Sequence, residues 1–424
     1  MGTQSQNSEP ILLLLNRDSI FRRVETGLTA VAAGKFVVVA DNADREDEGD
    51  LILAAEKATP EALAFMIRYT SGIVCVPLPG ERLRELGLPL MVAENTESQG
   101  TEFTVSVDLK RGTTTGISAA DRAATIRGLA NPSAFSDDFL RPGHIFPLRA
   151  REGGVLKRPG HTEAAVDLAR LAGSRPAGVL CEIVNGDGTM MRGAALTTFA
   201  ERHGLPFLAV SDLIAYRRSR ERIVERTAEL RLPTAHGTFQ VYVYRSKLDG
   251  SEHLAIVKGE ISGCENVLAR LHSECFTGDL LGSARCDCGQ QFEQALSRIE
   301  QEGAGVVVYL REHGERSHGL TSKVQAHAVH DYGCRAVETN GELGLPVNSD
   351  SYDIGAQVLS DLGLTTIRLI SNNPAACIQV PGYDLAIVGH VPLSRRPYVL
   401  SNGPTARRAR TEGARELTRG FTLG

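Results

Sequence analysis

Three cysteines in the second half of the chain have the spacing of a metal site. Cys275, Cys286 and Cys288 follow one another as Cys-x10-Cys-x-Cys, in a chain that has eight cysteines in all. Three thiolates suit a zinc ion with one open coordination position, where bound water can become a nucleophile near neutral pH. A structural zinc site is the alternative, although such sites usually have four protein ligands. The cysteines therefore predict Zn²⁺ in this half.

An acidic loop in the first half is a second candidate site. Residues 44–50 read D-R-E-D-E-G-D and carry five carboxylates. They come after a Val-rich segment, residues 36–40, which is typical of a buried strand. Mg²⁺ binds to one or two carboxylates together with substrate oxygens, and sites on α/β sheets lie at strand ends. A solvated acidic turn is the alternative, but the position after a buried strand favours a cation site.

Two Pro-Gly-His turns strengthen this interpretation. His144 and His161 each follow Arg-Pro-Gly, and His161 opens a predicted helix. Backbone N–H groups at the start of that helix, together with Thr162, could hold a phosphate. A lone histidine after a turn is usually structural. Two in the same context, with Cys181-Glu182 ending another predicted strand, point to a functional site.

The elements that would position these residues alternate between strand and helix. In the first half we predict strands at residues 36–40, 73–77, 101–107 and 179–183, and helices at 60–70 and 162–172. In the second half we predict strands at residues 239–244 and 306–309, and helices at 292–301 and 354–362. This alternation predicts an α/β protein with mixed sheets.

The length of 424 residues predicts two domains of roughly 200 residues each. We expect a flexible N-terminus over residues 1–19 and a first domain over residues 20–217. A charged helix over residues 218–231 is the predicted linker. The second domain is expected over residues 232–400, and residues 401–424 are expected to be a solvated tail.

The composition argues against a nucleic-acid-binding or membrane protein. The formal charge is −5, Trp is absent and aromatic residues make up 5% of the chain, so neither a basic patch nor a base-stacking surface is expected. The longest early apolar run, residues 11–15, is far shorter than the roughly 20 residues of a membrane span, and no signal-peptide pattern surrounds it. The cysteines do not indicate a disulfide framework. We expect a cytoplasmic protein whose partners are small molecules.

The first half resembles 3,4-dihydroxy-2-butanone-4-phosphate synthase over about residues 20–217. The matching motifs are D-R-E-D-E-G-D at 44–50, S-G-I-V-C at 71–75, T-T-T-G-I-S-A-A-D-R at 113–122, R-P-G-H-I-F-P-L-R-A at 141–150, R-P-G-H-T-E-A at 158–164 and G-V-L-C-E at 178–182. Glu102 is a departure, since a small residue is usual there. Enzymes of this family use Mg²⁺ or Mn²⁺ to release C4 of ribulose 5-phosphate as formate, which leaves a four-carbon phosphorylated dihydroxybutanone.

The resemblance implies roles for individual residues. Glu46 and His161 would be the metal ligands. The residues expected to contact the sugar phosphate are Arg45, Asp50, Arg158, Gly160, Thr162 and Glu182. The residues expected to take part in catalysis, including its proton transfers, are His144, Glu182, Asp44 and Glu48. A metal that bridges adjacent oxygens would stabilise enediolate charge, while carboxylates and imidazole move protons.

The second half resembles GTP cyclohydrolase II over about residues 230–400, in the order found in bifunctional riboflavin-pathway enzymes. The matching motifs are R-L-H-S-E-C-F-T-G-D at 270–279, R-C-D-C-G at 285–289 and S-N-N-P at 371–374. The resemblance implies a zinc site at the three cysteines and a homodimer. Its implied nucleotide-binding residues are Arg270, Glu274 and Gln291, with weaker matches at Arg316 and Ser371.

Several other positions of this half depart from the family pattern. The usual Glu-Gly-Arg triplet is permuted, and the usual Tyr, Thr, Asp, Arg and Lys are each replaced; these positions are 314–316, His327, Ala336, Asn348, Asp350 and Ala376. An Asn cannot accept a proton as a carboxylate does, and Asp350 would repel a triphosphate that an Arg attracts. Such a charge change can weaken binding by more than about a hundredfold.

The sequence therefore leaves three hypotheses open. The leading one is a synthase fused to a cyclohydrolase-like domain that keeps zinc but does not hydrolyse GTP in the usual way. The second is a bifunctional enzyme that acts on GTP or on a modified purine nucleotide. The third treats the second domain as a regulatory or interaction module.

Overall fold

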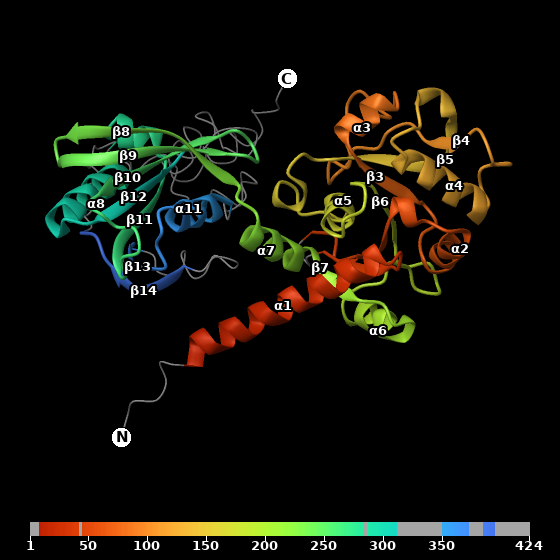
Figure 1. The fold of residues 1–424 in the computed structure, drawn as a ribbon, viewed down its shortest axis with the longest axis horizontal. Helices are drawn as coiled ribbons and strands as arrows, with labels where there is room; N and C mark the ends of the chain where they lie inside the picture. The colour runs from red at the N-terminus through yellow and green to blue at the C-terminus, as the bar shows by residue number, and fades with distance from the viewer. Residues whose placement is uncertain (1–7, 42–44, 284–285, 312–349, 373–384, 395–424) are drawn as a thin grey trace, which may run out of the picture. The chain divides into compact units, whose positions relative to one another are not determined.

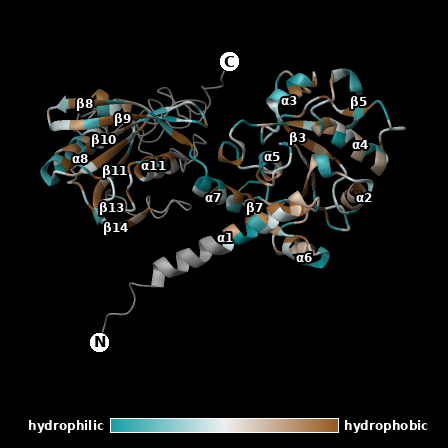
Figure 2. Cartoon of the chain, viewed as in Figure 1, coloured by the Kyte–Doolittle hydropathy of each residue, from teal (hydrophilic) through white to brown (hydrophobic). Residues whose placement is uncertain are grey.

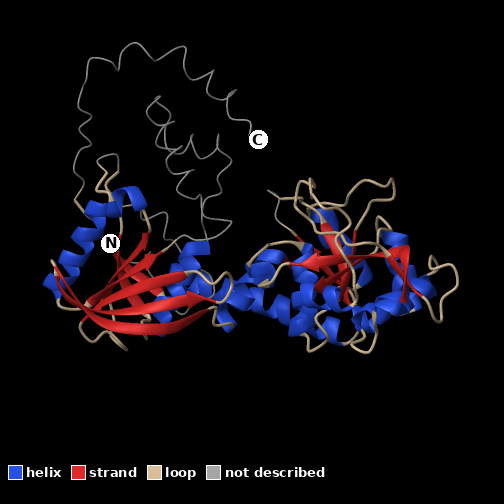
Figure 3. Cartoon of the chain, turned by 90° about the horizontal axis from the view of Figure 1, so that it is seen from above, coloured by secondary structure: helices blue, strands red, loops and turns tan. Residues whose placement is uncertain are grey.

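The computed structural model describes residues 8–41, 45–283, 286–311, 350–372 and 385–394. The chain divides into two compact units, Met1–Glu221 (unit 1) and Arg222–Gly424 (unit 2). Each unit contains one seven-stranded mixed sheet with helices packed beside it (Figures 1 and 3). The predicted fold class, α/β with mixed sheets in two domains, is confirmed.

The sheet of unit 1 has the strand order β4-β5-β3-β6-β2-β1-β7. Its strands are β1 (Val37–Ala40), β2 (Gly49–Ala54), β3 (Cys75–Pro79), β4 (Val107–Leu109), β5 (Phe139–Ala150), β6 (Gly178–Glu182) and β7 (Phe207–Ala209). Its helices are α1 (Ser8–Ala32), α2 (Pro60–Tyr69), α3 (Gly80–Glu85), α4 (Ala119–Ala130), α5 (His161–Leu171), α6 (Ala194–His203) and α7 (Val210–Arg220).

Both faces of this sheet are covered, as the apolar strands require. Along β2, Leu51 and Leu53 pack into a core with α2 and α4, while Ile52 and Ala54 pack into a core with α5. Side chains on a strand alternate between faces, so one strand contributes to both cores. Each fully buried Leu or Ile stabilises the fold by about 1.5–3 kcal/mol. Figure 2 shows the apolar interior of this sheet in brown, for example at β3.

Unit 2 has the strand order β14-β13-β11-β12-β10-β9-β8. Its strands are β8 (Val224–Thr234), β9 (Gly237–Ser246), β10 (Glu252–Lys258), β11 (Val267–Ser273), β12 (Gly305–Leu310), β13 (Thr366–Ile370) and β14 (Ala386–Val391). Helix α8 (Cys288–Glu302) packs on one face through Leu296 and Ile299. Helix α11 (Asp350–Asp361) packs against the sheet as well; a side chain on its Gly355 would meet Leu271 of β11.

Three predicted segments differ from the structure. The predicted linker helix over residues 218–231 is wrong, because α7 ends at Arg220 and Val224–Thr234 is the edge strand β8. Its charged residues are typical of a helix, but β8 pairs with β9 along its whole length, and charged side chains on an edge strand oppose aggregation. The N-terminus is helical from Ser8, instead of flexible through residue 19.

The third difference is the predicted strand at residues 101–107. Only Val107 belongs to a strand, and the earlier residues run beside β5 through the isolated bridge Phe103↔Leu148. Pro147 of β5 has no N–H to donate, which interrupts a regular ladder at this point. No helix within the described residues is long and apolar enough to span a membrane.

Candidate functional site

The candidate residues of unit 1 lie along one edge of its sheet. Cys75 of β3 lies opposite both Phe146 of β5 and Leu180 of β6. β3 is parallel to β5 and antiparallel to β6. His144 is two residues from Phe146 and Glu182 is two residues from Leu180, and these strand directions place both toward the same edge of the sheet. Since residues two apart on a strand share a face, both lie on the α5 side. Two strand spacings separate them by roughly 10 Å.

The same edge continues through β2 and β1. Glu182 lies opposite Asp50 of β2, and Asp50 lies opposite Val39 of β1. Asp41 follows the last residue of β1 and completes the row. The strand ends of one sheet therefore bring carboxylates and an imidazole together from segments more than 100 residues apart in sequence.

Asp41 holds the acidic loop in place. Its Oδ2 accepts hydrogen bonds from Arg45 Nη1 at 2.8 Å and from Glu46 N at 3.3 Å. Its Oδ1 accepts one from Glu48 N at 3.0 Å. Arg45 Nη1 also donates to Glu46 Oε2 at 2.8 Å. The Asp41 side chain is fully buried, so these contacts fix the backbone of the loop.

His161 faces this loop from the first turn of α5. Its Nε2 lies 3.1 Å from Val39 O, so this nitrogen carries the proton and donates it. Its Nδ1 lies 3.7 Å from Glu46 Oε2 and 3.9 Å from Asp50 Oδ1. A histidine held through one nitrogen by a backbone carbonyl presents the other to a metal.

The donor atoms fit a hard divalent cation. Ligand atoms of Asp41, Glu46 and His161 all lie within 4.8 Å of one another. Asp50 Oδ1 is buried beside them and has no hydrogen-bond partner among the described residues. A cation bound here would neutralise the carboxylates and satisfy that oxygen, which agrees with the preference of Mg²⁺ for oxygen ligands.

The crowding of charges shifts the pKa values of the cluster. Burial raises the pKa of Asp50 to about 7. Burial by itself lowers the pKa of His161, but the charges of Asp50 and the contact with Glu46 outweigh it and raise the pKa to about 9. The hydrogen bond with His161 lowers the pKa of Glu46, and burial raises that of Glu48. Without a metal, His161 and Asp50 therefore retain protons that cation binding has to displace.

Two arginines meet at the start of α5. A Cβ on Gly160 would lie 2.7 Å from Arg158 Nη1 and 3.2 Å from Arg45 Nη2. Arg158 Nη1 donates to Glu163 Oε2 at 2.8 Å, and the Glu163 side chain is buried. Gly160 is the N-cap residue and supplies no capping side chain. The helix N-terminus and the two guanidinium groups therefore form a surface that attracts an anion.

Glu182 is oriented by Ser71. Ser71 Oγ donates to Glu182 Oε2 at 2.7 Å, and Ser71 N donates to Glu182 O at 2.8 Å. The neighbouring Cys181 is buried, which raises its pKa to about 11 and keeps it a thiol. Cys181 is therefore not a nucleophile at this strand end.

His144 is paired with Asp108. Its Nδ1 lies 2.7 Å from Asp108 Oδ2, and its backbone N–H donates to Asp108 Oδ1 at 2.9 Å. A Cβ on Gly116 would lie 2.0 Å from Asp108 Oδ2, so only glycine leaves room for this carboxylate. Asp108 favours the proton on Nδ1, which leaves Nε2 as the ring nitrogen that exchanges protons.

The structure thus gathers most of the predicted residues of unit 1 at one edge. They are Arg45, Glu46, Glu48, Asp50, Arg158, Gly160, His161, Thr162 and Glu182, with His144 further along the same edge. Asp44 lies outside the described residues. Asp41, Ser71 and Asp108 are functional residues that the sequence patterns did not predict. Of these, Asp41 follows the predicted strand, whereas Asp108 is recognisable only from the pairing of β4 with β5.

The three cysteines of unit 2 converge as predicted. Their sulfur atoms lie within 4.8 Å of one another, and Cys275 Sγ is 3.7 Å from Cys286 Sγ. Tetrahedral zinc with Zn–S bonds of about 2.3 Å requires sulfur atoms about 3.8 Å apart. A hydrogen bond from Cys288 lowers the pKa of Cys275, whereas the pKa of Cys288 is raised in return by the same contact and that of Cys286 by burial. The donor set therefore fits zinc.

Two glycines allow this convergence. A Cβ on Gly278 would lie 2.7 Å from Cys286 Sγ and 3.2 Å from Cys275 Sγ. A Cβ on Gly289 would lie 2.3 Å from Gly278 O. The turn Phe276–Leu280 and the start of α8 consequently close around the sulfur atoms only because both residues lack side chains.

Of the predicted nucleotide-binding residues of unit 2, one is buried, two follow strand ends and one lies outside the described residues. Arg270 is buried, and its Nη2 donates to Gln291 Oε1 at 2.8 Å. Glu274 lies at the end of β11, with Oε1 4.0 Å from Arg311 Nε. Ser371 follows β13, and its N–H donates to Val391 O at 3.1 Å. Arg316 lies outside the described residues, as do the departures at 314–315, 327, 336, 348 and 376.

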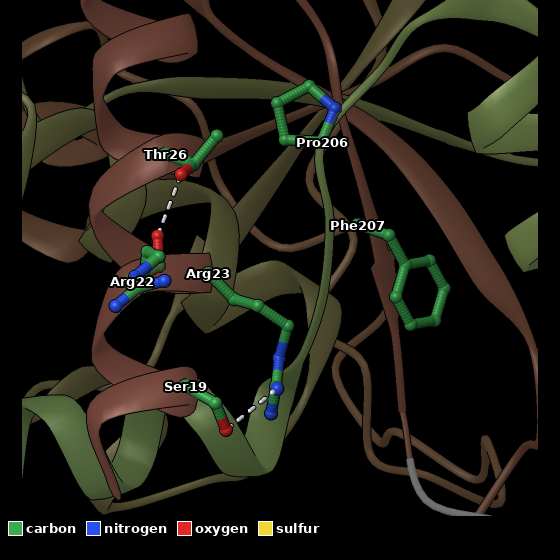
Figure 4. Close-up of a pocket in the computed structure, with 6 residues that line it drawn as sticks. All are labelled: Ser19, Arg22, Arg23, Thr26, Pro206 and Phe207. Atoms are coloured by element: carbon green, nitrogen blue, oxygen red, sulfur yellow. Dashed lines mark hydrogen bonds between the residues drawn. The ribbon is translucent and has the colours of Figure 1, made fainter. Parts of the chain in front are cut away.

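A pocket of about 400 Å³ lies elsewhere in unit 1, between α1 and the segment that enters β7 (Figure 4). It is lined by Ser19, Arg22, Arg23, Thr26, Pro206 and Phe207. Arg23 forms an ion pair with Asp212 at 2.7 Å. None of the lining residues is a candidate site residue, and the contacts of Arg23 attach α1 to α7.

Comparisons with known proteins divide the chain in the same way. A family model described as 3,4-dihydroxy-2-butanone 4-phosphate synthase matches residues 25–216, and one described as GTP cyclohydrolase II matches residues 225–392. The riboflavin biosynthesis protein RibBA of Nocardia farcinica is 55% identical over 378 residues, which cover 89% of this chain and 91% of that protein. The bifunctional riboflavin biosynthesis protein RIBA 1 of Arabidopsis thaliana is 54% identical over 88% of this chain and 69% of its own length.

A solved structure covers both units. It is a two-domain 3,4-dihydroxy-2-butanone 4-phosphate synthase, RibBX, from A. baumannii, and it is 37% identical to this chain. The match covers 86% of this chain and 99% of that one, with a TM-score of 0.66.

Proposed function

Because the chain belongs to the riboflavin biosynthesis family in which a 3,4-dihydroxy-2-butanone 4-phosphate synthase domain precedes a GTP cyclohydrolase II domain, we propose that unit 1 carries the synthase activity. Unit 1 acts as a lyase that converts D-ribulose 5-phosphate into 3,4-dihydroxy-2-butanone 4-phosphate and formate. The observation that carries this proposal is the cluster of Asp41, Glu46 and His161 beside Arg45 and Arg158. It combines a cation site with an anion site, as a sugar phosphate requires.

The arginines and the helix N-terminus bind the substrate phosphate. Arg45 and Arg158 approach each other at Gly160, and Thr162 lies in the first turn of α5. Guanidinium groups form paired hydrogen bonds with phosphate oxygens, and the N-terminus of α5 adds a favourable dipole. The phosphate end of the sugar is thereby fixed relative to the acidic loop.

The carboxylates and His144 perform the proton transfers. Glu46, His161 and Asp41 hold Mg²⁺ or Mn²⁺, which when bound stabilises negative charge on adjacent substrate oxygens. Glu182, oriented by Ser71, and His144, oriented by Asp108, lie on the same face and accept and return protons during the rearrangement. Glu48 has a raised pKa and is a further proton carrier at the loop.

Formate release from ribulose 5-phosphate tests this assignment. We expect His161→Ala and Glu46→Ala to lower kcat by at least about 100-fold, since each removes a metal ligand and a charge partner of the other. Glu201→Ala is the matched control, because Glu201 is exposed on α6. Unchanged formate release by either site variant would contradict the assignment.

Unit 2 keeps zinc but does not convert GTP into the usual diaminopyrimidine product. The three converging cysteine sulfur atoms support the zinc. The loss of cyclohydrolysis is supported by Asn348 and Asp350, which replace the aspartate and arginine of the family pattern, and by Ala376. The A. baumannii relative of similar architecture is likewise described as a two-domain synthase.

The intact set of three cysteines also favours one alternative activity. A zinc site that retains its ligands could open the purine ring although the residues for pyrophosphate release are replaced. Incubation of the purified protein with GTP, followed by mass spectrometry, separates the cases. If no product forms, unit 2 is non-catalytic. A ring-opened formamide triphosphate supports the alternative activity. The diaminopyrimidine product contradicts both cases.

A further inference from the structure

One carboxylate in unit 2 contacts both the zinc loop and the sheet beneath it. Asp279 Oδ2 accepts hydrogen bonds from Cys275 N at 2.8 Å and from Tyr309 Oη at 2.9 Å. Its own backbone N–H donates to Cys275 O at 2.6 Å. Asp279 is therefore hydrogen-bonded to both the N–H and the carbonyl oxygen of Cys275, and its side chain is only 8% exposed.

His272 supplies a third donor to the same carboxylate. Its Nε2 lies 3.1 Å from both Asp279 oxygens, while its Nδ1 lies 3.2 Å from Arg270 Nη2. A guanidinium group can only donate, so Nδ1 accepts and Nε2 carries the proton. Three donors from three residues thus converge on Asp279, and all three contact its Oδ2.

The donors belong to the rigid part of unit 2. His272 of β11 and Tyr309 of β12 are register partners, and their rings stack at 5.5 Å between centroids. Phe292 of α8 packs on both rings, at 5.1 Å and 5.3 Å. The position of Asp279 is consequently set by the sheet and by the same helix whose first residue is Cys288.

We propose that Asp279 is a positioning residue for the thiolate site, which holds Cys275 Sγ at zinc-binding distance from Cys286 and Cys288. The proposal rests on the zinc site proposed for unit 2. Cys275 precedes the other two cysteines by more than ten residues, and the turn Phe276–Leu280 begins the segment between them, so its backbone benefits from an anchor of its own. Outer contacts that orient ligands usually contribute tenfold or more to metal affinity.

Asp279→Asn tests the proposal with the full-length protein. An Asn oxygen in the place of Oδ2 can still accept from Cys275 N and Tyr309 Oη, but an amide N–H then replaces Oδ1 and opposes the N–H of His272, and the negative charge that attracts all three donors is lost. We expect zinc affinity, measured by chelator competition, to fall about 10- to 100-fold. Cobalt substitution gives a second readout: the thiolate-to-cobalt absorption band should lose about a third of its intensity as three sulfur ligands become two.

Two further variants complete the design. Asp249→Asn is the matched control, because Asp249 accepts from Ser251 N and Oγ in the turn between β9 and β10; its zinc affinity should equal that of the wild type. Tyr309→Phe removes one donor and leaves the backbone contacts, so a smaller but measurable loss of zinc affinity, about three- to tenfold, is expected. This milder variant also serves if Asp279→Asn fails to fold.

The outcomes separate this inference from the zinc site itself. If the wild type binds no zinc, the proposed zinc site is wrong. If the wild type binds zinc and Asp279→Asn binds it equally tightly with an unchanged cobalt spectrum, Asp279 is not a positioning residue. If Asp279→Asn does not fold, the Tyr309→Phe variant decides. A zinc affinity and a cobalt spectrum of Tyr309→Phe equal to those of the wild type would overturn the inference.

Discussion

Replacing Gly160 by Ala tests the proposed phosphate site without removing any charged group. The backbone of Gly160 is extended, with φ −127° and ψ 165°, so alanine fits its conformation. The added Cβ would lie 2.7 Å from Arg158 Nη1 and 3.2 Å from Arg45 Nη2, whereas ordinary contact begins at 3.4 Å. Arg158 has to move by about 0.7 Å, the difference between 2.7 and 3.4 Å.

This displacement sets the size of the effect. A hydrogen bond between charged groups contributes about 1.5–3 kcal/mol, and it weakens steeply when its geometry is lost. Loss of about 1–3 kcal/mol of phosphate binding corresponds to a KM for ribulose 5-phosphate raised about 5- to 150-fold. The proton-transfer groups stay in place, so kcat should change by less than about threefold.

Steady-state formate release at varied ribulose 5-phosphate measures both constants. Gly186→Ala is the matched control, because a Cβ there meets no atom within 4 Å and its φ is outside the left-handed region. Thermal unfolding should show a Tm within about 2 °C of the wild type for both variants. An unchanged KM in Gly160→Ala would refute the placement of the phosphate between Arg45 and Arg158.

Three further predictions follow from contacts in the two units. Asp108→Asn removes the anionic partner of His144 and should lower kcat about 10- to 100-fold with little change in KM. The control Asp187→Asn, in an exposed turn, should have no effect. Equal kcat values for the two variants would contradict the role of Asp108. Mg²⁺ or Mn²⁺ binding, measured by calorimetry, should tighten as pH rises toward about 9, because the proton on His161 has to leave first; a pH-independent affinity would show that His161 is not a ligand. Gly278→Ala should release zinc while formate production persists, because its Cβ would displace Cys286 Sγ; full zinc occupancy in the variant would contradict the packing described for the thiolates.

Sequence patterns could predict those parts of the site that are local in the chain. The acidic loop follows a buried strand, and His161 begins a helix, so their proximity to a sheet edge follows from strand and helix signals alone. The three cysteines converge because Gly278 and Gly289 lie between and beside them. Such features depend on residues a few positions apart.

Other parts depend on pairings that no local pattern records. Asp108 meets His144 because β4 pairs with β5, and Asp279 meets Tyr309 because β11 pairs with β12. The strand β8 was predicted as a helix since its many Arg and Glu residues favour one, and only pairing with β9 makes it a strand. Asp41 could have been found, since it follows the strand directly and precedes the acidic loop by three residues.

The chemistry of unit 1 is tested most directly by the fate of C4 of ribulose 5-phosphate. Wild-type protein with Mg²⁺ would be incubated with substrate labelled by ¹³C at that carbon, and the products would be analysed by NMR. The account predicts labelled formate and an unlabelled dihydroxybutanone phosphate, with neither product formed by His161→Ala. Label retained in the phosphorylated product, or no formate from the wild type, would contradict it.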